Sequence, residues 1–184
     1  SRHSASGLRR SSSGSMRNPV AAGTYTVTAT VGAQILTGTV YITGSTVTNV
    51  TVAADPTALN AVAKFTLSFV TSASGSLVAN SGTILVDFPS TVTLPSSIAS
   101  GQITVNGTAA TYVSITSGNA ISITTPVYVA PSQQVTVIIP ATVGIRNPSS
   151  SGLTVSVAVS TSSDTVASTA SYVTTTSQIT QPQV

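Results

Sequence analysis

Apolar and polar residues alternate along most of the chain, with the period of two that is typical of β-strands. The first run covers residues 24–31. It places Thr24, Thr26, Thr28 and Thr30 on one face and Tyr25, Val27, Ala29 and Val31 on the other. Gly32-Ala33-Gln34 follows as a turn, and residues 35–42 return as a second run. This arrangement predicts a β-hairpin.

Residues 47–175 continue in short apolar runs separated by Gly, Pro, Asn and Ser. We expect strands at 47–52, 64–70, 83–88, 103–105, 112–115, 121–123, 134–139, 153–160 and 170–175. Asn106-Gly107 predicts a tight hairpin turn, because both residues tolerate positive φ. Residues 95–99 predict one helical turn, because proline is favoured at the first helical position. Since each strand has one apolar face, two sheets must stack to bury these faces. The prediction is therefore an all-β fold, a β-sandwich of about seven to nine strands preceded by a hairpin.

One pattern occurs twice in the chain. It consists of an apolar residue, Arg-Asn-Pro, a short loop closed by Gly and an alternating strand, and it stands at 16–31 and again at 145–159. The two copies start about 130 residues apart, a period that corresponds to one small β domain. Residues 16–45 thus match only the closing part of a repeat. Because an isolated hairpin is marginally stable in water, we expect this partial repeat to pair with the sandwich or with another subunit.

The composition supports a strand-rich core and excludes several classes of protein. Hydrophobic residues make up 41% of the chain but aromatic residues only 4%, so the core must consist mainly of Val, Ile, Leu and Ala. Charged residues make up 5%, against about 25% in an average soluble domain. There is no cysteine, which excludes a disulfide framework. No apolar run approaches the roughly 18 residues that a membrane span needs.

The formal net charge of +3 comes from the first residues of the chain, which carry Arg2, Arg9, Arg10 and Arg17. This segment is short, Ser-rich and without aromatic residues, so we expect no binding of nucleic acid. The expected division is a disordered or processed tail at 1–15, the partial repeat at 16–45, the sandwich at 46–176 and a C-terminal tail at 177–184.

Residues for catalysis are sparse. The only histidine is His3, and the chain has neither Cys nor Glu, so we expect no nucleophile paired with a general base. Asp55, Asp87 and Asp164 each stand near a turn or a strand end, which is typical of residues that favour turns or solubility. The alternative is a calcium site that combines Asp87 or Asp164 with loop carbonyls. We expect no catalytic residue, no cofactor and no metal, and therefore no enzyme.

Four motifs follow one another between residues 88 and 148. They are Phe88-Pro89, Leu94-Pro95-Ser96-Ser97-Ile98, Ile103-Thr104-Val105-Asn106-Gly107-Thr108-Ala109-Ala110 and Gly144-Ile145-Arg146-Asn147-Pro148. Together they resemble an immunoglobulin-like repeat found in tandem in large surface and S-layer-like proteins of bacteria, many of them thermophiles. The segment from Arg17-Asn18-Pro19 to Ile42 resembles the last hairpin of a preceding copy. The resemblance implies an immunoglobulin-like sandwich, a passive structural role and an extracellular location at the cell surface.

The sequence is compatible with three functions. The first is a structural surface protein that assembles with itself or with neighbouring repeats by strand pairing, as a filament or a layer. This hypothesis rests on the unpartnered hairpin and on a surface that nearly lacks the charges that normally guard edge strands. The second is binding of a cell-wall glycan or another surface through exposed tyrosines, with Tyr112 and Tyr128 as the candidates. The third is ice binding through the threonines at 24–30.

Two sequons for N-glycosylation also occur, Asn49-Val50-Thr51 and Asn106-Gly107-Thr108. Such triplets arise by chance in a chain rich in Thr, and the second is explained by its turn. We therefore treat modification at either asparagine as a secondary hypothesis.

Overall fold

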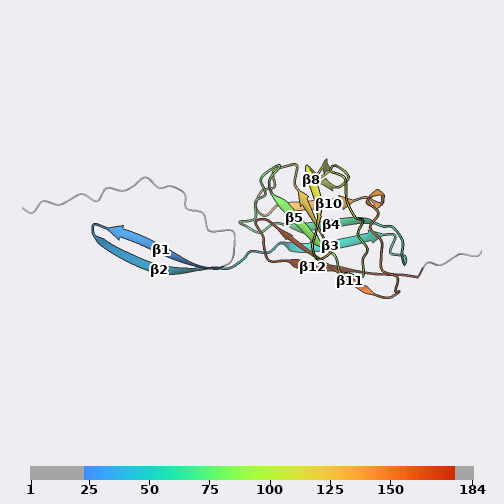
Figure 1. The fold of residues 1–184 in the computed structure, drawn as a ribbon, viewed down its shortest axis with the longest axis horizontal. Coiled ribbons are helices and arrows are strands. Elements are labelled where there is room, and N and C mark those ends of the chain that lie inside the picture. Colours follow the sequence, from blue (N-terminus) through green and yellow to red (C-terminus); the bar gives the residue numbers. More distant parts are fainter. Residues whose placement is uncertain (1–22, 177–184) are drawn as a thin grey trace, which may run out of the picture. The chain divides into compact units, whose positions relative to one another are not determined.

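A computed structural model describes residues 23–176, which form two compact units. The first is a two-stranded hairpin and the second is a β-sandwich, and they divide between Ile42 and Thr43 (Figure 1). The division comes slightly before the expected one at 45/46, because Ser45 already belongs to the sandwich. Its hydroxyl donates to the carbonyl of Ser163, and its own carbonyl accepts the N–H of Val166. The expected tails at 1–15 and 177–184 lie outside the described residues, as does the first copy of Arg-Asn-Pro.

The hairpin consists of β1 (Gly23–Val31) and β2 (Gln34–Ile42). Gly32 opens the two-residue turn with a φ of 62°, which the first position of a type II′ turn requires. The antiparallel register places Thr28 opposite Thr37 and Ala29 opposite Leu36. The predicted hairpin and its alternation are therefore confirmed.

The register also defines two faces, because directly opposite residues of an antiparallel pair point to the same side. The apolar face comprises Tyr25, Val27, Ala29, Val31, Leu36, Val40 and Ile42 together with Gly23, Gly38 and the polar Gln34. The threonine face comprises Thr24, Thr26, Thr28, Thr30, Ile35, Thr37, Thr39 and Tyr41.

The sandwich consists of two five-stranded sheets in which all neighbouring strands are antiparallel. The first sheet has the order β3 (Thr48–Asp55), β4 (Lys64–Val70), β10 (Gln134–Ile139), β6 (Thr104–Val105), β7 (Thr108–Ala109). The second has the order β12 (Ser168–Val173), β11 (Thr154–Thr161), β5 (Thr83–Asp87), β9 (Ala120–Thr124), β8 (Tyr112–Thr116). The all-β prediction is thus confirmed, and residues 43–176 contain ten strands where seven to nine were expected. The additional strand is the two-residue β7, which follows the predicted Asn106-Gly107 turn and pairs with the expected strand β6.

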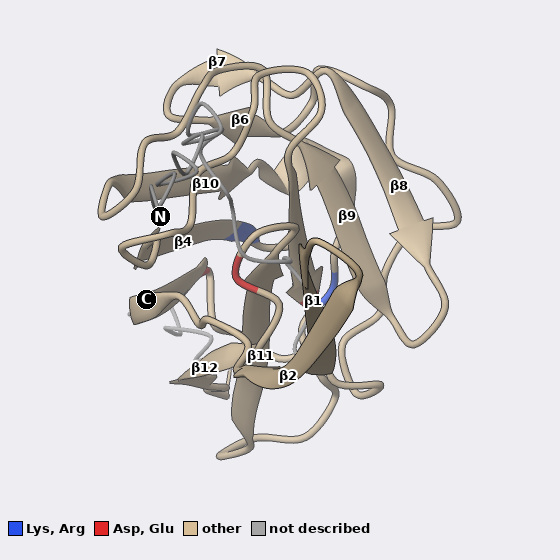
Figure 2. Cartoon of the chain, turned by 90° about the vertical axis from the view of Figure 1, so that its left-hand side faces the viewer, with Lys and Arg blue, Asp and Glu red and all other residues tan. Residues whose placement is uncertain are grey.

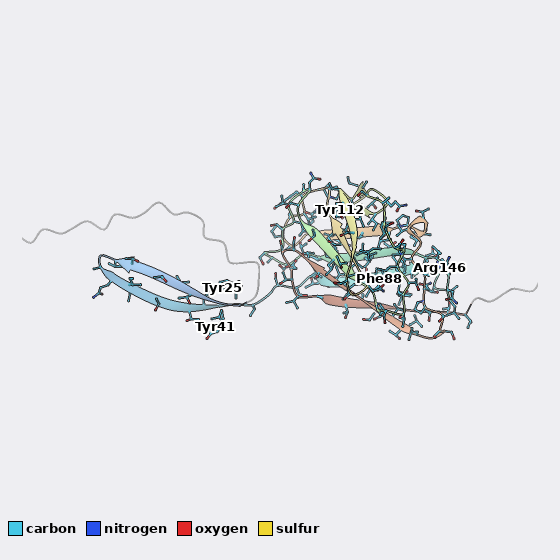
Figure 3. The ribbon with its side chains drawn as sticks, in the orientation of Figure 1. Tyr25, Tyr41, Phe88, Tyr112 and Arg146 are labelled. Carbon is cyan, nitrogen blue, oxygen red and sulfur yellow. The ribbon has the colours of Figure 1, made fainter. Side chains whose placement is uncertain are left out.

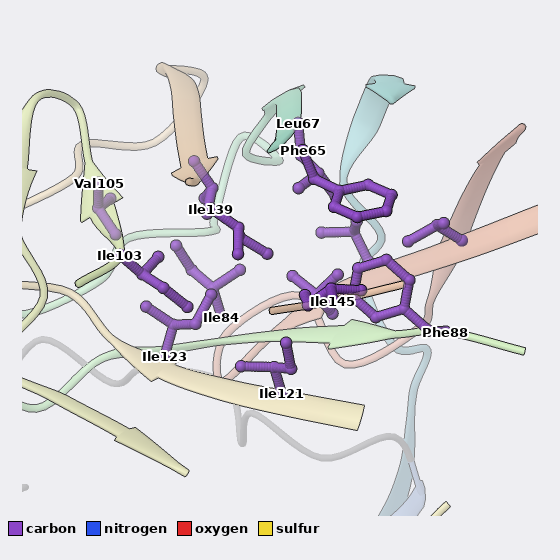
Figure 4. Close-up of a cluster of buried hydrophobic side chains, with 14 of the residues drawn as sticks. Phe65, Leu67, Ile84, Phe88, Ile103, Val105, Ile121, Ile123, Ile139 and Ile145 are labelled. Carbon is purple, nitrogen blue, oxygen red and sulfur yellow. The ribbon is translucent and has the colours of Figure 1, made fainter. Parts of the chain in front are cut away.

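One continuous core fills the space between the two sheets (Figure 4). Alternate residues of each strand point into it: β4 contributes Phe65, Leu67 and Phe69, all fully buried. The rings of Phe65 and Phe88 meet edge to face with centroids 5.2 Å apart, which joins the first sheet to the chain that leaves the second. Since burying one such side chain contributes roughly 1.5–3 kcal/mol, this alternation is the main reason why the two sheets stack.

The sandwich is closed on one side and open on the other. The edge strands β3 and β12 are joined to each other by parallel bridges, Thr46 with Val166 before them and Ala58 with Thr175 beyond them. On the opposite side, β7 and β8 end their sheets.

The helical turn predicted at 95–99 is wrong. Thr93 exchanges two backbone hydrogen bonds with Arg146, and Ile98 is buried in the core, so tertiary contacts override the local preference of a proline. The only helix among the described residues is a short 3-10 helix at Ala141–Val143, which follows Pro140. Gly144 ends it with a φ of 90°.

Candidate functional site

The acidic residues do not form a common site in the described part of the chain. Asp55 and Asp87 are exposed, and Asp55 stands opposite Lys64 in the register of β3 with β4. Asp164 lies in the turn between β11 and β12, as expected, but it is fully buried. A solubility role is therefore wrong for Asp164. No group of three or more His, Cys, Asp or Glu side chains within residues 23–176 is placed to hold a metal ion, and Figure 2 shows how few charged residues the described strands carry.

The buried carboxylate of Asp164 fixes the loop after β4. Its Oδ2 accepts the N–H of Ser72 at 3.0 Å, and its own N–H donates to the hydroxyl of Thr161 at 2.8 Å. Gly75 lies against this carboxylate: a Cβ added to Gly75 would stand 2.1 Å from Oδ2. Oδ1 is buried and has no hydrogen-bond partner among the described residues. These contacts assign Asp164 to loop geometry, and a calcium site that combines it with loop carbonyls remains a prediction.

Asn147, from the second Arg-Asn-Pro motif, joins parts of both sheets. Its Nδ2 donates to the carbonyls of Pro56 at 2.7 Å and Ala58 at 3.0 Å, in the loop between β3 and β4. Its Oδ1 accepts the hydroxyl of Tyr172, on β12, at 3.0 Å. The four groups of this cluster come from three separate parts of the sequence, and Asn147 connects them at one end of the sandwich. The sequence singled out Asn147 only as part of a repeat, and it gave no signal for these partners.

Tyr172 completes this contact between the sheets. Its ring meets the edge of Phe65 with centroids 5.8 Å apart, and its side chain is almost completely buried. Burial disfavours the charged phenolate and raises the pKa of Tyr172 from 10.0 to about 12.

The raised pKa predicts a loss of stability at alkaline pH. The buried, protonated phenol of Tyr172 contributes fully to the free energy of unfolding below pH 10.0. This contribution is lost as the pH rises toward about 12, because the unfolded chain releases the phenol proton first. We expect the free energy of unfolding to fall over this interval in the wild type and to fall less steeply in Tyr172→Phe. Urea unfolding followed by circular dichroism at several pH values measures this difference, and identical slopes for the two proteins would contradict it.

The candidate binding and modification residues are exposed but scattered. Tyr112 and Tyr128 are both more than half exposed, as the glycan hypothesis requires, and they belong to β8 and to the loop before β10. Asn49 is exposed where the register of β3 shifts, and the Oδ1 of Asn106 accepts the N–H of Thr136 at 2.8 Å. Glycan binding and glycosylation remain predictions.

The hairpin carries six of the twelve exposed large apolar side chains of the described residues. Its exposed large side chains are Val40 at 43%, Val27 at 51%, Leu36 at 59%, Val31 and Ile35 at 68% and Tyr41 at 77%. Tyr41 and Tyr25 lie near each other at the end of the hairpin opposite its turn (Figure 3). Neither strand of the hairpin carries a charged residue. These exposed apolar side chains are grouped on one small element, whereas those of an ordinary surface are scattered, so the hairpin is the candidate interaction surface.

Comparison with known protein families and with curated proteins gave no match. Among the described residues, no helix has the length and apolar character to cross a membrane.

Proposed function

We propose that this chain is a non-enzymatic structural module of an extracellular surface protein, and that its subunits assemble by strand pairing into a filament or a layer. The hairpin carries the proposal: among the described residues its two strands pair only with each other, and their largely exposed apolar face forms no core of its own. Pairing with another subunit would bury this face and add backbone hydrogen bonds at a strand edge.

The surface chemistry supports assembly through strands. Natural proteins guard their edge strands with charges, prolines or bulges that prevent pairing with other chains. The described part of this chain has two basic and three acidic residues, none of them on the hairpin. The resemblance to tandem immunoglobulin-like repeats of bacterial surface proteins agrees with this role and suggests the location at the cell surface.

The test compares assembly of the full chain with that of a variant whose apolar face carries charge. We expect the wild type to form oligomers as its concentration rises, and Val27→Lys with Leu36→Lys to remain monomeric, because lysine ammonium groups cannot be buried without a partner. Sedimentation velocity measures the size distribution, and electron microscopy shows whether the product is a filament or a layer.

Val173→Lys is the matched control, because Val173 stands on β12 with the same exposed fraction as Val27, 51%. It should leave assembly unchanged. A wild type that stays monomeric up to the solubility limit would refute the proposed function, and equal loss of assembly in Val173→Lys would show a general effect of charge.

A further inference from the structure

One edge of the sandwich is open to another strand. Of the four edge strands, β3 and β12 are bridged to each other, and β7 has only two residues. β8 has five residues and pairs only with β9 among the strands that the structure describes. It contains no proline and no charged residue, so nothing along it prevents the addition of a further strand.

The two sides of β8 match the two faces of the hairpin. Val113 is buried and Ile115 partly buried on the core side of the sheet, while Tyr112, Ser114 and Thr116, each with a hydroxyl group, lie on the outer side. Ile115 stands opposite the buried Ile121 of β9. The apolar side of the sheet therefore extends to the edge strand β8, where Ile115 is only partly buried. A strand added beside β8 would continue both layers only if it were apolar on one face and hydroxyl-rich on the other.

β1 has this pattern along its whole length. Every second residue from Tyr25 to Val31 is apolar, and the residues between them are threonines. β2 is less regular, because Ile35 and Tyr41 lie on the threonine face and Gly38 interrupts the apolar one. β1 is therefore the better match for β8.

The β8–β9 hairpin is also held in place as an acceptor. Asn119, in its turn, donates through Nδ2 to the carbonyls of Pro89 and Val92, both at 2.9 Å. An edge that is already fixed loses little conformational freedom when a strand is added to it.

The partner that offers β1 is a second copy of this chain, because the proposed function pairs the hairpin with another subunit.

We propose that β8 is the acceptor edge for assembly, and that β1 of a second copy pairs with it so that the apolar faces join on the core side and Ser114 lies among the threonines. This inference rests on the proposed function and names the partner surface for it. The contact joins two different surfaces, so it is heterologous.

Cysteine cross-linking tests the pairing, because the chain has no cysteine of its own. Ser114→Cys is mixed in turn with Thr26→Cys, Thr28→Cys and Thr30→Cys, and each mixture is oxidised mildly. Residues of one strand face repeat every two positions, about 6.8 Å, so one of the three should lie opposite Ser114 within reach of a disulfide. Ser171→Cys on the bridged strand β12 is the control.

We expect a cross-linked dimer of one hairpin variant with Ser114→Cys in severalfold excess over the dimer with Ser171→Cys. Equal yields with Ser114→Cys and Ser171→Cys would overturn the inference. Oligomers whose cross-links join only hairpin to hairpin would also overturn it, while leaving the proposed function intact. If the wild type formed no oligomers, both this inference and the proposed function would be contradicted.

Discussion

Asn147→Ala is expected to lower the free energy of unfolding of the sandwich by about 2–4 kcal/mol, because it leaves several polar groups without their partner at once. The carbonyls of Pro56 and Ala58 lose their donor, and the hydroxyl of Tyr172 loses its acceptor. The side chain of Asn147 is only 2% exposed, so water replaces it poorly. Urea unfolding followed by circular dichroism measures the change.

Two further variants show whether the effect belongs to this cluster. Ser149→Ala, on an exposed neighbour of the motif, should change stability by less than about 0.5 kcal/mol. Tyr172→Phe removes one hydrogen bond, and the double variant with Asn147→Ala should lose less than the sum of the two single changes, because both remove the same contact. Additive losses would refute the proposed coupling.

The second large effect concerns Gly75. Gly75→Ala should destabilise the sandwich by about 2–3 kcal/mol, since its new methyl group must displace a buried side chain. The added Cβ would stand 2.1 Å from Oδ2 of Asp164, well inside contact distance. The same unfolding measurement gives the size of the loss.

The clash should disappear in a variant that lacks the carboxylate of Asp164. In Asp164→Ala, the further change Gly75→Ala should cost less than about 1 kcal/mol, because the obstructing oxygens are gone. Gly38→Ala, at a glycine with no neighbouring atom within 4 Å, serves as the control for the substitution itself. An undiminished loss in the Asp164→Ala background would show that the strain arises elsewhere.

The strands were predictable because each buries one face. In β4 and β10 every second residue points into the core, so a period of two in the sequence is a direct record of burial. The turn at Asn106-Gly107 was predictable for a local reason, since φ is positive at both residues. The helical turn at 95–99 failed because the contacts of Thr93 and Ile98 with distant residues outweigh a local preference.

The polar clusters were not predictable from the sequence. Asp164 has the neighbours of an ordinary turn residue, and its contacts with Ser72 and Gly75 lie about 90 residues earlier in the chain. Asn147 contacts groups about 90 residues earlier and Tyr172 later in the chain, and no local pattern records such pairs. The two-sided hairpin, by contrast, was visible at once, because its alternation does not depend on partners far away in the chain.

Because β3 and β12 are bridged, one side of the sandwich is closed, while the side with the edge strands β7 and β8 is open. In the assembly that we propose, each added subunit pairs its hairpin with the β8 edge of one neighbour and exposes its own β8 edge to the next. The geometry of this contact therefore sets no final length. The two ends of such a polymer would differ. One end would carry an unpaired hairpin and the other an unpaired β8 edge, so the polymer would be polar.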